Sequence, residues 1–123
     1  MNHFLIAAGA ATGLIWALHT FAGQVTVARP LLDAPDLAHT PKHTQFYCWH
    51  IVTLLLLALP AAFVFAALAP QHIALAWMAT GIVTAMSVLG LVLPPLTGER
   101  YLDMPQGWLF LPVAVLGFAG LLT

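Results

Sequence analysis

Long apolar segments alternate with short polar ones along the whole chain. Predominantly hydrophobic residues cover 4–27, 46–68, 73–93 and 105–122, and none of these segments contains Asp, Glu, Lys or Arg. A helix needs about 20 such residues to cross the hydrocarbon core of a bilayer. Membrane β-strands would instead alternate apolar and polar residues, and no such alternation is present in LLLLALPAAFVFAALA. The pattern predicts an all-α polytopic membrane protein, a single domain (1–123) formed by an antiparallel bundle of four transmembrane helices.

Composition supports this prediction. Hydrophobic residues make up 62% of the chain and charged residues only 6%, whereas soluble domains carry about 25% charged residues. A net charge of −1 gives no basic surface for nucleic acid, so we expect no nucleic-acid partner. The first segment lacks the basic start of a signal peptide and is longer than its apolar core, so we expect it to be retained as a helix.

The charged residues indicate an orientation. All of them lie in the predicted loops 28–45 and 94–104, and the short connection near residue 70 has none. Because Lys and Arg favour the cytoplasmic side, we expect these two loops in the cytoplasm and both termini on the opposite, periplasmic side. The charged side chains are Arg29, Asp33, Asp36, Lys42, Glu99, Arg100 and Asp103.

Small residues at four-residue spacing predict close helix packing. Gly9 and Gly13 form such a pair in the first segment, and Gly81 and Ala85 form one in the third. Small residues let helix backbones approach closely in lipid, where apolar burial gives little driving force. We expect these positions to serve packing within the bundle, with a contact between two copies of the chain as the less favoured alternative.

Polar and aromatic residues gather where the first two segments meet the predicted cytoplasmic side. His19 lies ten residues before Arg29, and His50 lies eight residues after Lys42. At 1.5 Å per residue, both imidazoles are roughly 12–15 Å inward from these charges. We therefore expect the two histidines to meet between adjacent antiparallel helices, in a cluster that the three- and four-residue spacing extends to Trp16 and Tyr47.

Several uses of this cluster remain open. One is a haem b held between His19 and His50, since histidine is a common axial ligand. Another is a pocket for a quinone or lipid head group, with His19, His50, Tyr47 and Arg100 as hydrogen-bonding partners. A structural interpretation places the aromatic residues in the interfacial belt and lets the histidines bond each other, Gln24 or a backbone carbonyl.

Metal binding and catalysis find little support in the sequence. The side chains of Cys48 and His50 project about 200° apart on a helix, so they would not share a metal. His39 and His43, four residues apart, form a better-spaced pair, but without a third ligand we predict no metal site. No Ser-His-Asp, P-loop or HExxH pattern appears, and the absence of a carboxylate within the segments argues against a proton-coupled drug exporter. We therefore lean towards a protein that is not an enzyme.

Three stretches, LHTFAGQ, QFYCWH and PQGWLFLP, give the chain a resemblance to small bacterial four-helix membrane proteins of the DoxX-like kind. The resemblance covers the whole chain and implies a bacterial inner (cytoplasmic) membrane location. Some proteins of that group are small subunits or partners of quinone-linked oxidoreductases. The leading hypothesis is a non-catalytic accessory or assembly subunit of a larger inner-membrane complex, with lipid and other membrane subunits as partners. The alternative is a haem b- or quinone-binding redox protein using His19 and His50, and the third is a small transporter.

Overall fold

The computed structural model describes all 123 residues, and every regular element in it is helical. The structure therefore confirms the prediction that the chain is all-α. The elements are α1 (His3–Ala17), the π-helices η1 (Leu18–Ala22) and η2 (Gln24–Ala28), α2 (Arg29–Asp33), α3 (His39–Leu68), the 3-10 turn η3 (Pro70–His72), α4 (Ile73–Thr97) and α5 (Gln106–Leu122).

Three helical stretches are long and apolar enough to cross a membrane. They are His3–Asp33, in which α1 continues through the π-helices into α2, then His39–Leu68, and Pro70–Thr97. The fourth apolar helix, α5, is shorter, with 17 residues. All three stretches extend past the predicted boundaries, because residues after position 27, before position 46 and after position 93 also adopt helical structure.

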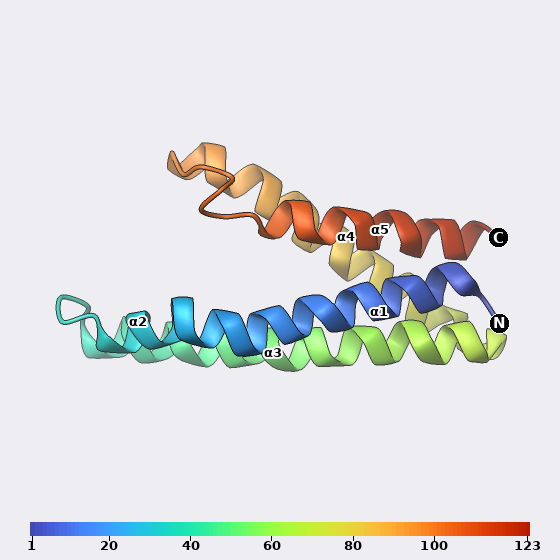
Figure 1. The fold of residues 1–123 in the computed structure, drawn as a ribbon, viewed down its shortest axis with the longest axis horizontal. Helices are drawn as coiled ribbons and strands as arrows, with labels where there is room; N and C mark the ends of the chain where they lie inside the picture. The colour runs from blue at the N-terminus through green and yellow to red at the C-terminus, as the bar shows by residue number, and fades with distance from the viewer.

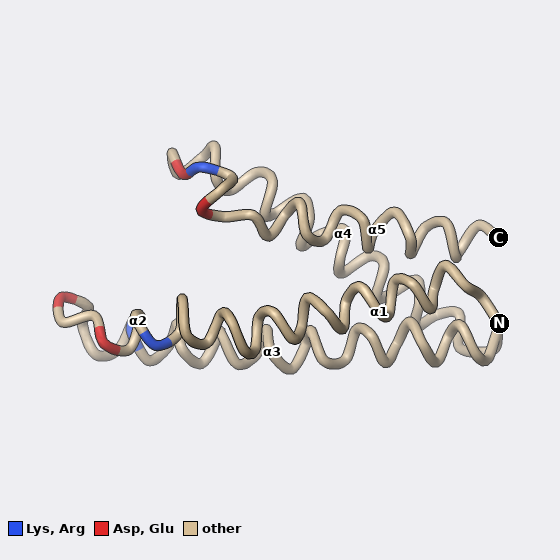
Figure 2. The backbone as a smooth tube through the Cα atoms, viewed as in Figure 1, with Lys and Arg blue, Asp and Glu red and all other residues tan.

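The helices form two pairs. α1 packs along α3 and α4 packs along α5, while α1 also contacts α5. In Figure 1 the pairs approach each other at the end that holds both termini and diverge towards the opposite end. Figure 2 shows that the charged residues of both long loops lie at that diverging end. The charged residues, which lie in two segments of the sequence, are thus also grouped at one end of the structure.

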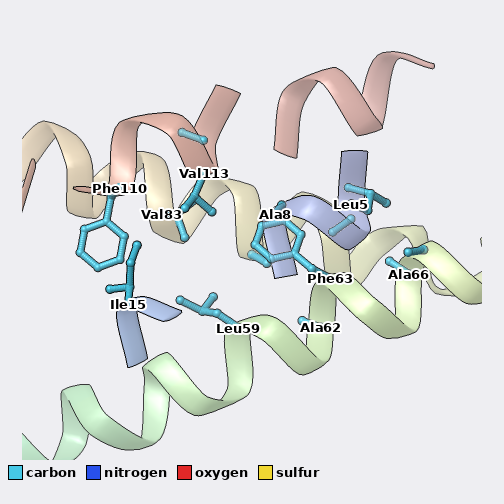
Figure 3. Packing of buried hydrophobic residues seen from close by; sticks show 14 of the residues in the cluster. Leu5, Ala8, Ile15, Leu59, Ala62, Phe63, Ala66, Val83, Phe110 and Val113 are labelled. Carbon is cyan, nitrogen blue, oxygen red and sulfur yellow. The ribbon is translucent and has the colours of Figure 1, made fainter. Parts of the chain in front are cut away.

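The core is narrow and lies where the pairs converge. Only 24 of 123 residues are buried, and small alanines are prominent among them, so the helices approach closely around a few large side chains. Phe63 and Leu59 of α3 pack with Leu5 of α1, Val83 of α4 and Val113 of α5 (Figure 3). Many other large apolar side chains are exposed, as expected for helices whose outer faces contact lipid.

Glycines mark the closest approaches between helices. A Cβ on Gly107 of α5 would lie 2.5 Å from the carbonyl carbon of Gly90 of α4. Gly9 of α1 faces α3, where a Cβ would lie 3.1 Å from Val64, in agreement with the prediction of packing within the bundle. A Cβ on Gly81 would have no neighbouring atom within 4 Å, so the prediction that Gly81 serves packing within the bundle is wrong.

Candidate functional site

The site begins with an irregularity in the first helix. Residues 18–22 and 24–28 are π-helical, and Gly23 lies between the two segments. π-helical turns are rare and occur frequently at functional sites, because the extra residue in each turn reorients the side chains around it. Here the widened turns carry His19 on the side that faces α3.

His19 is anchored to α3 by its Nε2 atom. Nε2 lies 3.1 Å from Thr53 Oγ1 and 3.4 Å from the carbonyl oxygen of Trp49. The Thr53 hydroxyl donates its proton to that same carbonyl at 3.0 Å. Thr53 Oγ1 can therefore only accept from His19, so we assign the proton of the neutral imidazole to Nε2. In this tautomer Nδ1 is an acceptor, and no group of the protein donates to it.

The Trp49 indole completes this arrangement. Its ring stacks on the imidazole of His19 with centroids 3.9 Å apart and planes inclined by 18°. A Cβ on Gly23 would lie only 2.7 Å from Trp49 Cη2. The indole thus fits over Gly23, and a larger residue at that position would displace it.

A pocket of about 330 Å³ opens beside His19, and its lining residues come from the α1–α3 pair and from the start of α5. Figure 3 shows Ile15 of α1 and Phe110 of α5 pointing towards each other, and both line this pocket. Nine of its 14 lining residues are hydrophobic, so the few polar groups decide how a ligand is oriented. The lining residues are Ile15, Leu18, His19, Ala22, Gly23, Thr26, Val27, Trp49, Val52, Leu56, Pro105, Gln106, Leu109 and Phe110.

The first turn of α5 forms the other polar part of the pocket wall. Pro105 is the N-cap of α5, and no side chain caps the helix there. The first backbone N–H groups of a helix have no partner within it and carry a partial positive charge. Gln106 lines the pocket and therefore offers a donor on one wall, while His19 lies on another.

The structure revises the predicted cluster. His50 is exposed and packs edge-on against Phe46, with ring centroids 4.6 Å apart, and it does not line the pocket. No hydrogen bond or ring contact joins His19 to His50 as expected, and the hydrogen bonds of His19 go instead to the Trp49 carbonyl and to Thr53. Positions 49 and 50 project about 100° apart on a helix, and it is position 49 that faces the first helix.

This geometry also bears on the haem hypothesis. A haem held between two histidines needs both imidazoles directed at one iron from opposite sides. Nε2 of His19 is instead engaged with Thr53, and His50 lies outside the pocket. The arrangement does not provide the predicted ligand pair.

The other predicted site residues lie apart from the pocket. Trp16 is half-buried next to Phe21, and its buried Nε1–H has no hydrogen-bond partner. Tyr47 is 68% exposed, and Arg100 is exposed in the loop between α4 and α5. None of the three lines the pocket. Cys48 is exposed as well, and no three His, Cys, Asp or Glu side chains are close enough to hold a metal ion together.

Four residues of the site were not predicted from the sequence. They are Gly23, Trp49, Thr53 and Gln106. The burial of Leu56, which only the structure reveals, places positions 53, 52 and 49, three, four and seven residues earlier, on the same helix face. The buried stripe of α3 thus points to Trp49 and Thr53 rather than to His50.

Comparison of the chain with protein-family models, with curated proteins and with solved structures gave no match. The DoxX-like resemblance stays a prediction.

Proposed function

We propose that the protein is a non-catalytic membrane subunit that binds a quinone-type lipid in the pocket beside His19. The observation that carries this proposal is the pocket itself, an apolar space with one anchored imidazole in its wall. Its volume of about 330 Å³ lies at the lower end of the range for small-molecule sites. Such a space suits a ring-sized head group, while an isoprenoid tail extends between the helix pairs into lipid.

The assigned tautomer of His19 favours the reduced form of such a ligand. Nδ1 is an acceptor, so it pairs with a ligand hydroxyl, and a quinol supplies two hydroxyls. The second oxygen of the ring then accepts from Gln106 at the start of α5. A quinone has only acceptors and offers nothing to Nδ1. We therefore expect the quinol to bind more tightly than the quinone.

The proposal includes four membrane spans. At 1.5 Å per residue α5 is about 25 Å long, which is close to the thickness of the hydrocarbon core. With α5 as the fourth span, both charged loops lie on one side and both termini on the other. The positive-inside rule then supports cytoplasmic loops and periplasmic termini in the bacterial inner membrane.

The accessory role rests on how little of the chain lies outside the apolar helices. The loop between α2 and α3 and the loop between α4 and α5 are short, so partners would contact the protein mainly within the membrane. Mild detergent extraction followed by mass spectrometry of co-purifying chains tests this role. Recovery of a lone chain under cross-linking conditions contradicts it.

Binding is tested with decylubiquinol and decylubiquinone, followed by quenching of tryptophan fluorescence in detergent micelles. His19→Phe keeps a flat ring against Trp49 and removes the hydrogen-bonding nitrogens. One hydrogen bond contributes about 0.5–1.5 kcal/mol, so quinol affinity should fall roughly 2- to 12-fold. The matched control is His50→Phe, which makes the same change outside the pocket and should leave affinity unchanged.

Gly23→Ala provides an independent variant, because its methyl group displaces Trp49 without touching a hydrogen-bonding group. It should weaken both ligand forms together. Equal quinol affinity in the wild type and His19→Phe, or a larger loss in His50→Phe, contradicts the proposed site.

A further inference from the structure

A second cluster of chemistry-bearing side chains lies on the first turns of α3, away from the pocket. The imidazoles of His39 and His43 have ring centroids 4.2 Å apart and planes inclined by 48°. With Thr40, Thr44 and Tyr47 they line a shallow hollow of about 410 Å³. The function proposed above makes no use of these residues.

This hollow lies outside the apolar part of the helix. α3 has 30 residues, which makes it about 45 Å long, whereas the hydrocarbon core is about 30 Å thick. The apolar residues begin only at Phe46, so with the membrane spans proposed above the polar turns from His39 to Gln45 lie outside the hydrocarbon core. These residues are exposed, apart from the half-buried Lys42. They belong to the end of the molecule that carries the charged loops (Figure 2). Water is therefore available to complete the coordination of a bound ion.

Histidines four residues apart on a helix present their rings on one face, which is the spacing used by paired histidines in helical zinc sites. Imidazole is a good ligand for Zn²⁺, Ni²⁺ and Cu²⁺ and a poor one for Mg²⁺ and Ca²⁺. The first ring to bind holds the ion beside the second, and this raises the effective concentration of the second ligand. Two rings that already lie in contact need little rearrangement to share an ion.

We propose that His39 and His43 bind a divalent transition-metal ion across the first turn of α3, with water as the remaining ligands. Binding links the start of α3 to its second turn. Because both ligands belong to α3, the ion stabilises the start of that helix.

Isothermal titration of the full chain with Ni²⁺ in detergent, carried out on protein without a histidine tag, tests the proposal. His39→Ala should weaken Ni²⁺ binding by about tenfold or more, because the chelate is lost. His72→Ala, which removes a lone histidine in the connection between α3 and α4, should leave the affinity unchanged. Mg²⁺ at the same concentration should give no binding heat.

A variant that moves one imidazole tests whether the spacing of the two histidines, and not only their number, determines the Ni²⁺ affinity. The double substitution His43→Ala with Thr44→His keeps two histidines but places them five residues apart, so the rings diverge. It should bind Ni²⁺ as weakly as His39→Ala. Wild-type affinity in this double variant, or equal Ni²⁺ affinity of the wild type and His39→Ala, overturns the proposal. Far-UV circular dichroism of each variant establishes that the helices are intact.

Discussion

The contact between α4 and α5 is the best place to measure what close helix packing contributes to stability. In Gly107→Ala, the new methyl group would lie 2.5 Å from the carbonyl carbon of Gly90 and 2.6 Å from the backbone nitrogen of Leu91. Both are backbone atoms, so no side-chain rotation relieves the overlap. Restoring an ordinary contact of 3.4 Å requires the helices to separate by roughly 1 Å.

The size of the effect follows from three contributions. Overpacking costs about 1–3 kcal/mol, and a clash with backbone belongs at the upper end of this range. Separation also stretches the hydrogen bond from Ser87 Oγ to the carbonyl oxygen of Gly107, now 2.8 Å, and such bonds contribute about 0.6 kcal/mol in membranes. Replacing glycine by alanine in a helix, in contrast, stabilises the folded state by about 1 kcal/mol. We expect a net loss of about 2–3 kcal/mol in the free energy of unfolding.

Gly81→Ala is the matched control, because the same substitution in α4 meets no atom within 4 Å. It keeps the gain in helix propensity without the clash, so its stability should equal or exceed that of the wild type. Unfolding of each protein by SDS in mixed micelles, followed by circular dichroism, gives the free energies. If Gly107→Ala unfolds at the same SDS fraction as Gly81→Ala, the argument from close packing is wrong.

Two further substitutions test the anchor of the imidazole and the membrane spans. Thr53→Val keeps the shape of the side chain but removes the hydroxyl bound to His19, so the free energy of unfolding should fall by about 0.6 kcal/mol and by no more than about 1.7 kcal/mol. In a double-mutant cycle with His19→Phe the two losses should be non-additive, and additive losses would show that the bond contributes nothing. Leu56→Arg places a charge near the middle of α3 and should raise the apparent insertion free energy of that segment by about 2.5–3.5 kcal/mol. A glycosylation-site insertion assay measures this, and unimpaired insertion would contradict the assignment of α3 as a span.

The sequence could predict that the chain is helical and where its long apolar helices lie. This follows from one constraint, that backbone N–H and C=O groups in lipid must be satisfied within the segment itself. Any apolar run of about 20 residues without charge then has to be a helix. The polar segments 28–45 and 94–104, which hold every charged residue, are equally direct to locate. The structure makes part of these segments helical and gathers their charged residues at one end (Figure 2).

The sequence could not predict how each helix is rotated about its own axis, and the site depends on that rotation. In a soluble helix, a polar face and an apolar face show which side is buried. In lipid both the inner and the outer faces are apolar, as the exposed Leu57 and the buried Leu56 of α3 illustrate. The choice of His50 rather than Trp49 was an error of one residue, or about 100° on a helix, that no contrast between polar and apolar faces could correct.

Local backbone geometry was also settled only by tertiary structure. The sequence predicts a continuous helix over residues 4–27, whereas the structure contains two π-helical segments at residues 18–22 and 24–28, with Trp49 packed over Gly23. The start of α5, which contributes Gln106 to the pocket, is distant in sequence and reaches His19 only through the packing of the two helix pairs. The apolar pattern of the sequence thus predicted where the long helices lie, and the close fit of small residues decided which of their side chains meet.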